Sequence, residues 1–425
     1  MDCETCPTYE CKIKGVDTCI EERHICNKSV NCDDLRDEKL CYQNECETLA
    51  DNCEHICKDK KQGFECACRP GFYLDYDNKS CVHTCKDYSK HGCSQICLPA
   101  SGNANETHVC ECASGYTLEQ DGVSCKHNSE TRPYLLLVNK QYMNRLSVHK
   151  EKARYEILFN NEDYGNVIAA DYDFSSRRIF WLESAGVLSF SNITKPNRKV
   201  LVRHDIPKPL DLTVDWINTN VYFTEATRHS IFVIDLESKQ KKTILTDKLR
   251  PPNTVVCHPK SGYLYYTTIQ TSKYNATISR VGMNGKKSRV VYDKNMKNPH
   301  ALSIDYVTDT LYWSDVNAKR IEFISLKNLT TSRFLMHTPG AAYGLTVFEN
   351  FIYFTTTGPE AAVYKAHRWT GQNRTELRKS KNFEKYTGIT VSYFFVHLDL
   401  YKCKCPEFDL MAIFAGFLRE FFSPA

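Results

Sequence analysis

The chain has 425 residues, a formal net charge of +4 and 22 cysteines, and it is too long to be one small domain. The charge is uneven, because residues 1–60 carry 15 acidic and 8 basic side chains, a net −7, which leaves +11 for the rest. Two interpretations remain open: an ordinary solvated surface, or an acidic head that meets basic ligands or folds back on the remainder. No block of Lys and Arg is interleaved with aromatic residues, so nucleic acid is not an expected partner.

Nineteen of the cysteines fall within the first 125 residues, which is typical of a disulfide framework in an oxidising compartment. Seven Asn-x-Ser/Thr sequons suit the same secretory route, and one of them begins at Asn27. We predict glycosylation at the other six, Asn78, Asn105, Asn192, Asn275, Asn328 and Asn373. No apolar run follows Met1, and no stretch is long and apolar enough to span a bilayer. We therefore expect a fragment of a longer protein or an incomplete gene model.

Three units with six cysteines each come first, at residues 6–41, 46–81 and 85–125. A unit of this size has almost no apolar core, so disulfides or a bound ion must stabilise it. A polar linker, residues 126–133, then leads into the longer part of the chain.

A short aromatic strand recurs through this longer part. Its copies read LLVN, FWLE, VYFTE, LYYTT, LYWSD and IYFTT, and they begin at Leu136, Phe180, Val221, Leu264, Leu311 and Ile352. Aligned on the first aromatic position, they lie about 41 to 47 residues apart, a period typical of propeller blades. Each full repeat contains four short runs rich in β-branched and aromatic residues, separated by turn residues, which predicts four strands per repeat.

Several polar positions in these repeats have a structural explanation. Asp173, Asp215 and Asp305 each stand seven residues before the first aromatic position, and His258 takes that place in the fourth repeat. We expect these aspartates to end an inner strand and to order the following turn. Cys257 lies in a predicted inner strand, where a buried, unreactive thiol is expected.

The first repeat lacks an inner strand, whereas Gly388–Tyr393 is a lone inner strand after the last repeat. An open propeller would leave edge strands unpaired. We therefore predict that Gly388–Tyr393 pairs beside Tyr134–Asn139 and closes the ring.

These repeats resemble the YWTD repeats of the low-density lipoprotein receptor family, over roughly residues 134 to 392. The resemblance implies an all-β chain, with a six-bladed YWTD propeller at residues 134–393 after small disulfide-rich modules. Residues 6–41 resemble the complement-type ligand-binding repeat (LDL receptor class A), and residues 46–81 and 85–125 have the cysteine spacing of EGF-like modules. This order is similar to that of lipoprotein and vitellogenin receptors. Residues 394–425 depart from the family and are left unassigned.

The family's pairing implies nine disulfides, three in each module and none between modules. They are Cys6–Cys19, Cys11–Cys32, Cys26–Cys41, Cys46–Cys57, Cys53–Cys66, Cys68–Cys81, Cys85–Cys97, Cys93–Cys110 and Cys112–Cys125.

The resemblance also implies calcium sites in the first two modules. In the ligand-binding repeat the family uses four carboxylates, here matched by Asn27, Asn31, Asp37 and Glu38, with carbonyls at His24 and Ser29. Two of the four are amides, so affinity for Ca²⁺ should fall.

His24 also replaces a tryptophan of the family in the first module, and Asn27 replaces a lysine-capturing aspartate, which weakens the case for lysine capture. In the second module Glu45 and Asp59 match two calcium ligands, but Tyr42 replaces the first acidic one. The alternative is that Asp59 is an ordinary exposed turn residue.

No G-x-S-x-G or H-E-x-x-H motif occurs, so we predict no catalytic residues and no enzyme activity. The resemblance implies the extracellular ligand-binding part of an endocytic receptor for lipoprotein or yolk-protein particles, at the cell surface and, on cycling, in endosomes. Its membrane attachment would lie in the full-length receptor, and its propeller would assist ligand release in acid. The alternative is an adhesion or matrix propeller that binds a partner protein statically.

Five histidines of the propeller, His204, His229, His258, His300 and His337, occupy turn-like positions, so exposure is expected. Of these, His229 and His300 are the predicted pH sensors, because protonation near pH 6 would add positive charge to a basic propeller facing an acidic head.

Overall fold

The structure is a computed structural model, and it describes residues 9–392 with short gaps. The gaps are at 40, 42–43, 45, 48–51, 76, 87–90, 100–107, 114, 129–133, 140–141, 149–154, 161–164, 174–175, 194–196, 204, 328, 330–331, 359–360 and 380–385. The chain divides into two compact units, Met1–Glu111 and Cys112–Ala425. Among the described residues, no helix has the length and hydropathy needed to cross a membrane.

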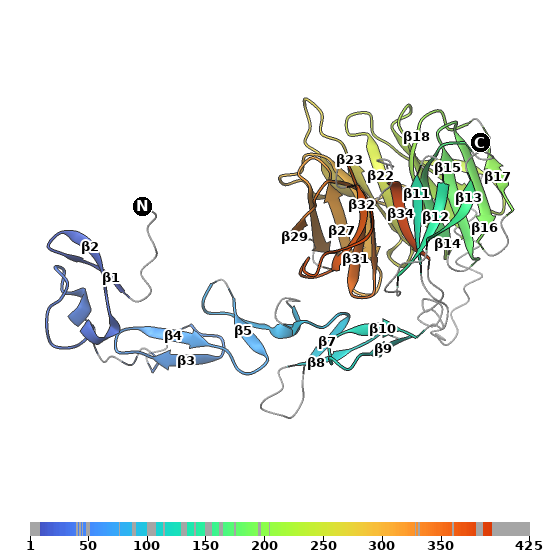
Figure 1. Ribbon diagram of the computed structural model, residues 1–425. Coiled ribbons are helices and arrows are strands. Elements are labelled where there is room, and N and C mark those ends of the chain that lie inside the picture. The colour runs from blue at the N-terminus through green and yellow to red at the C-terminus, as the bar shows by residue number, and fades with distance from the viewer. Residues whose placement is uncertain are drawn as a thin grey trace, which may run out of the picture. The chain divides into compact units, whose positions relative to one another are not determined.

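The first unit consists of short antiparallel hairpins (Figure 1). Its strands are β1 (Tyr9–Ile13), β2 (Val16–Ile20), β3 (Ile56–Asp59), β4 (Phe64–Ala67), β5 (Phe72–Leu74), β6 (Cys81–His83), β7 (Ile96–Pro99) and β8 (His108–Glu111). Three single turns of 3-10 helix accompany them, η1 (Glu22–His24), η2 (Arg36–Glu38) and η3 (Thr84–Lys86). The hairpins bury little apolar surface, so the disulfides supply much of the stability.

Eight of the nine predicted disulfides are present, and none joins two modules. They are Cys11–Cys32, Cys26–Cys41, Cys46–Cys57, Cys53–Cys66, Cys68–Cys81, Cys85–Cys97, Cys93–Cys110 and Cys112–Cys125. The ninth, Cys6–Cys19, involves Cys6 and lies outside the described residues.

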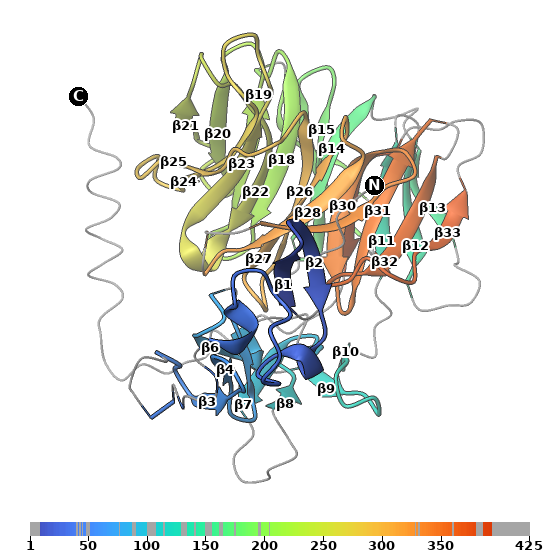
Figure 2. The ribbon, with the colours of Figure 1, turned by 90° about the vertical axis from the view of Figure 1, so that its left-hand side faces the viewer.

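The second unit begins with a small hairpin, β9 (Tyr116–Leu118) and β10 (Cys125–His127), and continues into six four-stranded antiparallel sheets (Figures 1 and 2). Blades 2 to 4 contain, in order from the inner strand outward, β14 (Val167–Asp173), β15 (Arg178–Glu183), β16 (Val187–Asn192) and β17 (Lys199–Val202); β18 (Pro209–Asp215), β19 (Asn220–Glu225), β20 (Ser230–Asp235) and β21 (Lys241–Thr246); β22 (Pro252–His258), β23 (Tyr263–Thr268), β24 (Thr277–Gly282) and β25 (Arg289–Tyr292). A 3-10 turn, η5 (Pro259–Ser261), connects β22 and β23.

Blades 5 and 6 follow the same order. They contain β26 (Pro299–Asp305), β27 (Thr310–Asp315), β28 (Arg320–Ser325) and β29 (Ser332–His337); β30 (Ala341–Phe348), β31 (Phe351–Thr357), β32 (Ala362–His367) and β33 (Thr375–Lys379). The predicted all-β fold with a six-bladed propeller is therefore confirmed.

Blade 1 is assembled from both ends of the propeller, as predicted. Its strands are β34 (Tyr386–Ser392), β11 (Tyr134–Asn139), β12 (Tyr142–Ser147) and β13 (Tyr155–Asn160). Strand β34 pairs antiparallel with β11, with Ser392 opposite Tyr134 and Gly388 opposite Val138. The inner strands contact one another in the order β34, β14, β18, β22, β26 and β30, and β30 contacts β34 again. The ring is thus closed and no inner strand is left as an edge.

Aromatic pairs stack within four of the blades, between the second and third strands. The pairs are Phe180–Phe190, Phe223–Phe232, Tyr312–Phe323 and Phe354–Tyr364, with ring centroids 5.3 to 5.4 Å apart. Each pair lies directly opposite in the strand register, where cross-strand aromatic contacts stabilise a sheet. The recurring aromatic position takes this packing role in Phe180 and Tyr312, whereas in the other two blades the next residue, Phe223 or Phe354, takes it.

Glycines fix how two blades contact their neighbours. In the turn between β24 and β25, a Cβ on Gly285 would lie 2.7 Å from the carbonyl oxygen of Ile244 in β21. In the corresponding turn of blade 6, a Cβ on Gly371 would lie 2.7 Å from the carbonyl oxygen of Leu335 in β29. Both glycines have positive φ, so the turn and the close approach each require glycine.

Candidate functional site

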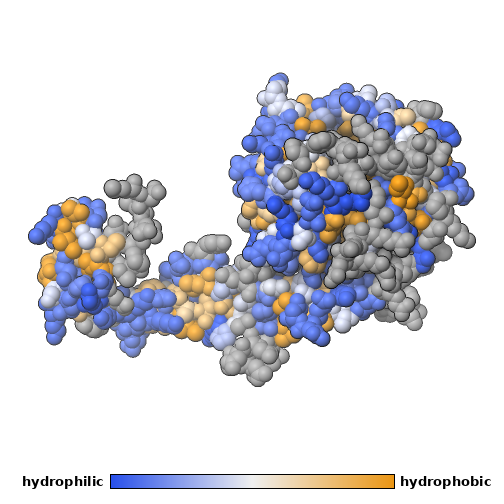
Figure 3. All heavy atoms as spheres, in the orientation of Figure 1, coloured by the Kyte–Doolittle hydropathy of each residue, from blue (hydrophilic) through white to orange (hydrophobic). Residues whose placement is uncertain are grey.

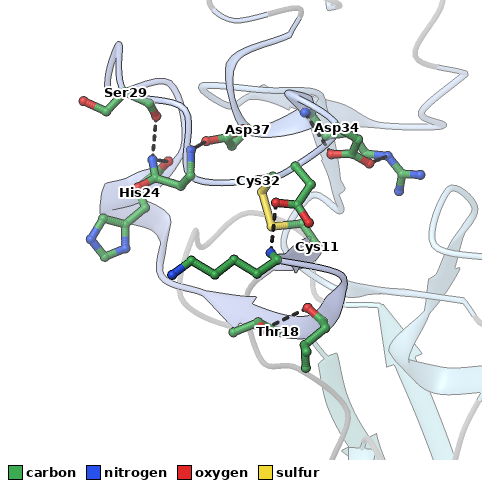
Figure 4. Close-up of a disulfide and its surroundings, with 12 residues drawn as sticks. Cys11, Thr18, His24, Ser29, Cys32, Asp34 and Asp37 are labelled. Carbon is green, nitrogen blue, oxygen red and sulfur yellow. Dashed lines mark hydrogen bonds and ion pairs between the residues drawn. A yellow bond between two sulfur atoms is a disulfide. The ribbon is translucent and has the colours of Figure 1, made fainter.

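The first module brings together the four side chains that sequence comparison placed at a calcium site (Figure 4). The backbone N–H of Asn31 donates to Oδ2 of Asp37 at 2.5 Å, and the backbone N–H of Asn27 donates to Oε1 of Glu38 at 2.7 Å. Asp37 is fully buried on η2, and its Oδ1 has no hydrogen-bond partner among the described residues. Two disulfides, Cys11–Cys32 and Cys26–Cys41, hold this loop.

The carbonyls of His24 and Ser29 also face this loop, as the resemblance implied. They accept hydrogen bonds from Nδ2 of Asn31 at 3.0 and 2.6 Å, and Oδ1 of Asn27 lies 3.3 Å from the same nitrogen. A cation needs oxygen lone pairs directed at it. In the described arrangement three oxygens lie around the Nδ2 group of Asn31, where a bound calcium ion would need an oxygen of that side chain instead.

The second predicted calcium site is not assembled among the described residues. Glu45 lies outside the part of the chain that the structure describes. Asp59 is exposed at the end of β3, opposite Phe64, a position compatible with an ordinary strand-end residue. The groups of three potential metal ligands found elsewhere in the described chain all contain disulfide cysteines, such as His55 with Cys68 and Cys81, and a disulfide sulfur is not a thiolate ligand.

The predicted glycosylation sites that the structure describes are accessible. Asn78, Asn275 and Asn373 are exposed, and Asn192 is half-buried at the end of β16. Asn105 and Asn328 lie outside the described residues. Use of these sites stays a prediction.

The predicted exposure of the propeller histidines is wrong for His258 and only partly met for the two predicted pH sensors. His258 is buried, and its Nε2 lies 3.1 Å from Oδ1 of Asp309 in the next blade. His229 is half-buried in the turn before β20. His300 lies within β26 rather than in a turn, with its ring 4.8 Å from that of Tyr343. His337 is exposed, and His204 lies outside the described residues.

The aspartates that end inner strands order the following turns, as predicted. One of them, Asp305, also forms an ion pair with a neighbouring blade. Asp215 accepts the backbone N–H groups of Ile217 and Asn218 at 3.0 and 3.1 Å. Asp305 accepts the N–H of Val307 at 3.1 Å and also binds the guanidinium of Arg368 at 2.6 Å. This buried ion pair joins blade 5 to blade 6, a contact that the sequence did not indicate.

Half-buried acidic side chains form hydrogen bonds across other blade boundaries. Asp171 of β14 accepts the N–H of Val214 at 2.8 Å, and Asp211 of β18 accepts the N–H of Val255 at 2.9 Å. Burial raises the pKa of Asp211 to about 7, helped by the nearby charge of Asp171 and opposed by its two backbone hydrogen bonds. A carboxyl group with this pKa changes charge between neutral and mildly acidic solution.

A further acidic group lies where the hairpin β9–β10 contacts the propeller. Oε1 of Glu349 accepts the backbone N–H of His127 at 3.1 Å, and the His127 ring lies 6.4 Å from that of Phe348. Burial raises the pKa of Glu349. These residues are more than two hundred positions apart in sequence, so no local pattern could have indicated the contact.

The unpaired thiol also has a structural setting. Cys257 is free and buried in β22, as predicted, and burial raises the pKa of its thiol. Thr213 of the adjacent inner strand lies 3.3 Å from its sulfur. A protonated, inaccessible thiol is a packing group.

Positive charge is concentrated on blades 3 and 4. Residues 239–297 contain 13 Lys and Arg but only 2 Asp and Glu, a net +11 in a chain whose total is +4. We define the basic wall as the exposed cations on β21, β25 and the turns before them: Lys239, Lys242, Lys286, Lys287 and Arg289. The close approach of Gly285 to Ile244 brings the turn before β25, which carries Lys286 and Lys287, against β21.

The surroundings of the basic wall suit a polar partner. Asp205, on the neighbouring loop, is paired with Lys241 and Arg228. Figure 3 shows a different side of the propeller, the one with β11 and β12, and there too hydrophilic residues dominate the described surface. An anionic surface is the chemistry that such a region attracts.

The fold and the disulfides define a class of protein in which small disulfide-bonded modules precede a closed six-bladed β-propeller. No family model matches the chain. In sequence it is 24% identical over 341 residues to the vitellogenin receptor Yl of Drosophila melanogaster, a match that covers 80% of this chain and 15% of that protein. The chain thus spans a small part of its relative's length.

Two solved structures show the same fold. The nidogen/laminin complex has a TM-score of 0.57 and 17% identity, over 61% of this chain and 98% of that chain. TolB from Acinetobacter baumannii has a TM-score of 0.50 and 10% identity, over 61% of this chain and 66% of that chain. With the vitellogenin receptor as a relative and the closed propeller after disulfide-rich modules, the resemblance to the low-density lipoprotein receptor family is confirmed.

Proposed function

We propose that this chain is an extracellular ligand-binding region of an endocytic receptor of the lipoprotein and vitellogenin type. The observation that carries the proposal is the similarity to a vitellogenin receptor over 80% of the chain, together with a closed propeller that follows disulfide-bonded modules. Binding rather than catalysis is proposed, and the domain boundaries remain those expected from the sequence. The ligand would be a lipoprotein or yolk-protein particle, bound at the cell surface and carried into endosomes.

The basic wall supplies a binding surface for such a partner. Its exposed cations would attract acidic patches of a protein, while the first module lacks the aspartate at Asn27 that lysine capture requires in the family. We therefore assign more of the binding to the propeller than to the first module. Contacts of this kind weaken with salt, because the screening length is about 10 Å at 0.1 M.

Acid-dependent release would depend on half-buried carboxyl groups that change charge. Asp211 has a pKa of about 7, and the raised pKa of Glu349 belongs to the contact between hairpin β9–β10 and the propeller. Protonation of Glu349 would weaken its hydrogen bond with the N–H of His127. On this proposal carboxyl groups contribute part of the acid response, in addition to the proposed sensors His229 and His300.

The second candidate is a static adhesion propeller, and the solved nidogen/laminin complex favours it because its propeller fold is the same. A direct binding assay distinguishes the endocytic receptor from the static adhesion protein. The full chain should retain a lipid-bearing yolk-protein particle at pH 7.5 and should not retain laminin. Stable binding of laminin, with no binding of the particle, would favour the adhesion function.

The basic wall can be tested in the same assay. The double variant Lys286→Glu with Lys287→Glu should weaken binding of the particle and flatten its dependence on salt. The matched control is Arg374→Glu with Lys379→Glu, which reverses two exposed charges on blade 6. Equal losses in both variants would show that total charge matters and that the basic wall is no site.

A further inference from the structure

An amide nitrogen, Nδ2 of Asn31, lies among several oxygens of the first module, two of which belong to His24 and Ser29, labelled in Figure 4. Nδ2 of Asn31 lies 2.6 and 3.0 Å from the carbonyl oxygens of Ser29 and His24, and 3.3 Å from Oδ1 of Asn27. Several oxygens converging on one point are the surrounding that a hard cation takes from a protein. Here an NH₂ group occupies that point.

The surrounding oxygens decide which way the carboxamide of Asn31 faces. With its nitrogen inward, the group donates to acceptors that carry no proton of their own. With its oxygen inward, four oxygens would face one another, which is tolerable only around a cation. Nitrogen without an ion and oxygen with an ion are therefore mutually exclusive states of the same loop.

The charge of the cluster favours the state without an ion. Only two carboxylates remain, Asp37 and Glu38, and each accepts a backbone N–H, at 2.5 and 2.7 Å. The Oδ1 of Asp37 is the one buried oxygen of the cluster with no donor among the described residues. A cation would satisfy this atom, whereas the Asn31 amide does not.

We propose that the Asn31 carboxamide takes the place of the cation, so that this module closes its acidic loop without calcium. The loop then stays closed whatever the concentration of free calcium, and loss of an ion cannot open it. The proposal goes beyond the receptor function and does not depend on it, because it concerns the folding of residues 9–41 alone.

The test is oxidative refolding of the full chain in calcium or in chelator, followed by peptide mapping of the first module. The expected result is the same yield of Cys11–Cys32 and Cys26–Cys41 in 2 mM EDTA as in about 2 mM calcium, a level at which extracellular sites are occupied. A native chain that forms these pairs only with calcium would overturn the proposal.

The variant Asn31→Asp supplies the second arm. It replaces the central nitrogen by oxygen, so correct pairing should now require calcium and should be lost in chelator. Correct pairing of this variant without calcium would also contradict the proposal. Asn52→Asp is the matched control, since Asn52 is exposed and lies outside the cluster, and its pairing should not respond to calcium. If Asn31→Asp does not fold under either condition, the response of the native chain alone decides.

Discussion

At the scale of single residues, the propeller is held by polar contacts that cross from one blade to the next. Arg368 and Asp305 are 2% and 8% exposed and form such a contact at 2.6 Å. Removing one partner of a buried pair leaves the other charge unpaired and desolvated, which is far more costly than losing an exposed pair. Other polar contacts also join neighbouring blades. They are made by Asp171, by Asp211 and by the pair of His258 with Asp309.

The pair of Arg368 and Asp305 gives the first prediction. Arg368→Met keeps most of the apolar stem but removes the charge, and it should lower the free energy of unfolding by about 3–5 kcal/mol. Unfolding is followed by tryptophan fluorescence, which reports on the propeller because all four tryptophans lie there. Arg228→Ala, in the exposed pair with Asp205, should cost less than about 1 kcal/mol. Similar losses would show that the buried pair has no special role.

Asp211 predicts a pH dependence of stability. Its pKa in the folded chain is about 7, above its ordinary value of 3.8, so the folded state holds the proton more tightly. The stability that this group contributes is complete below 3.8 and is lost as the pH rises through about 7. The melting temperature should therefore fall less between pH 5.5 and 7.5 in Asp211→Asn than in the native chain. An identical pH dependence in both would contradict the assigned pKa.

At the scale of elements, the sequence predicts the strands well but the contacts between blades poorly. The aromatic repeat predicted the six blades. The missing inner strand of the first repeat predicted the pairing of β34 with β11. The alternation of residues along a strand is a local pattern, so it can be detected from a single sequence. Contacts between blades are not local: His258 meets Asp309 from the next repeat, and for this reason its burial was missed.

The closing strand supports a prediction at this scale. A chain that ends at Lys385 lacks β34 and leaves β11 as an exposed edge, so it should unfold at lower temperature and aggregate. A chain that ends after Phe395 keeps the strand and should melt like the native chain. Equal melting temperatures for the two would mean that the ring closes by another route.

The turn glycines give a second element-scale prediction, with a control in the same blade. Gly262 has a φ of +69° and open space around it, so Gly262→Ala should cost only the left-handed strain, about 1–2 kcal/mol. Gly285→Ala adds a clash with the carbonyl oxygen of Ile244, 2.7 Å away, so its loss of stability should be clearly larger. Equal losses by tryptophan fluorescence would show that blades 3 and 4 do not depend on this close approach.

At the scale of the whole molecule, charge and disulfides divide the chain into parts with different roles. The modules are stabilised by covalent bonds and carry the acidic charge, whereas the propeller is stabilised by packing and carries a net +11 on residues 239–297. The overall classes of module were predictable from cysteine spacing. The basic wall was not recognised, because its cations are spread over two repeats and the approach of the β24–β25 turn to β21 is not visible in the sequence.

We propose that this region binds a particle at neutral pH and releases it in acid. The direct measurement is the dissociation rate of a yolk-protein particle from the immobilised full chain, after binding at pH 7.5 and a step to pH 5.5. The account predicts slow dissociation when the buffer stays at pH 7.5 and rapid loss of the particle after the step. Retention of the particle at the same rate at both pH values would contradict the claim and would assign the propeller to static adhesion.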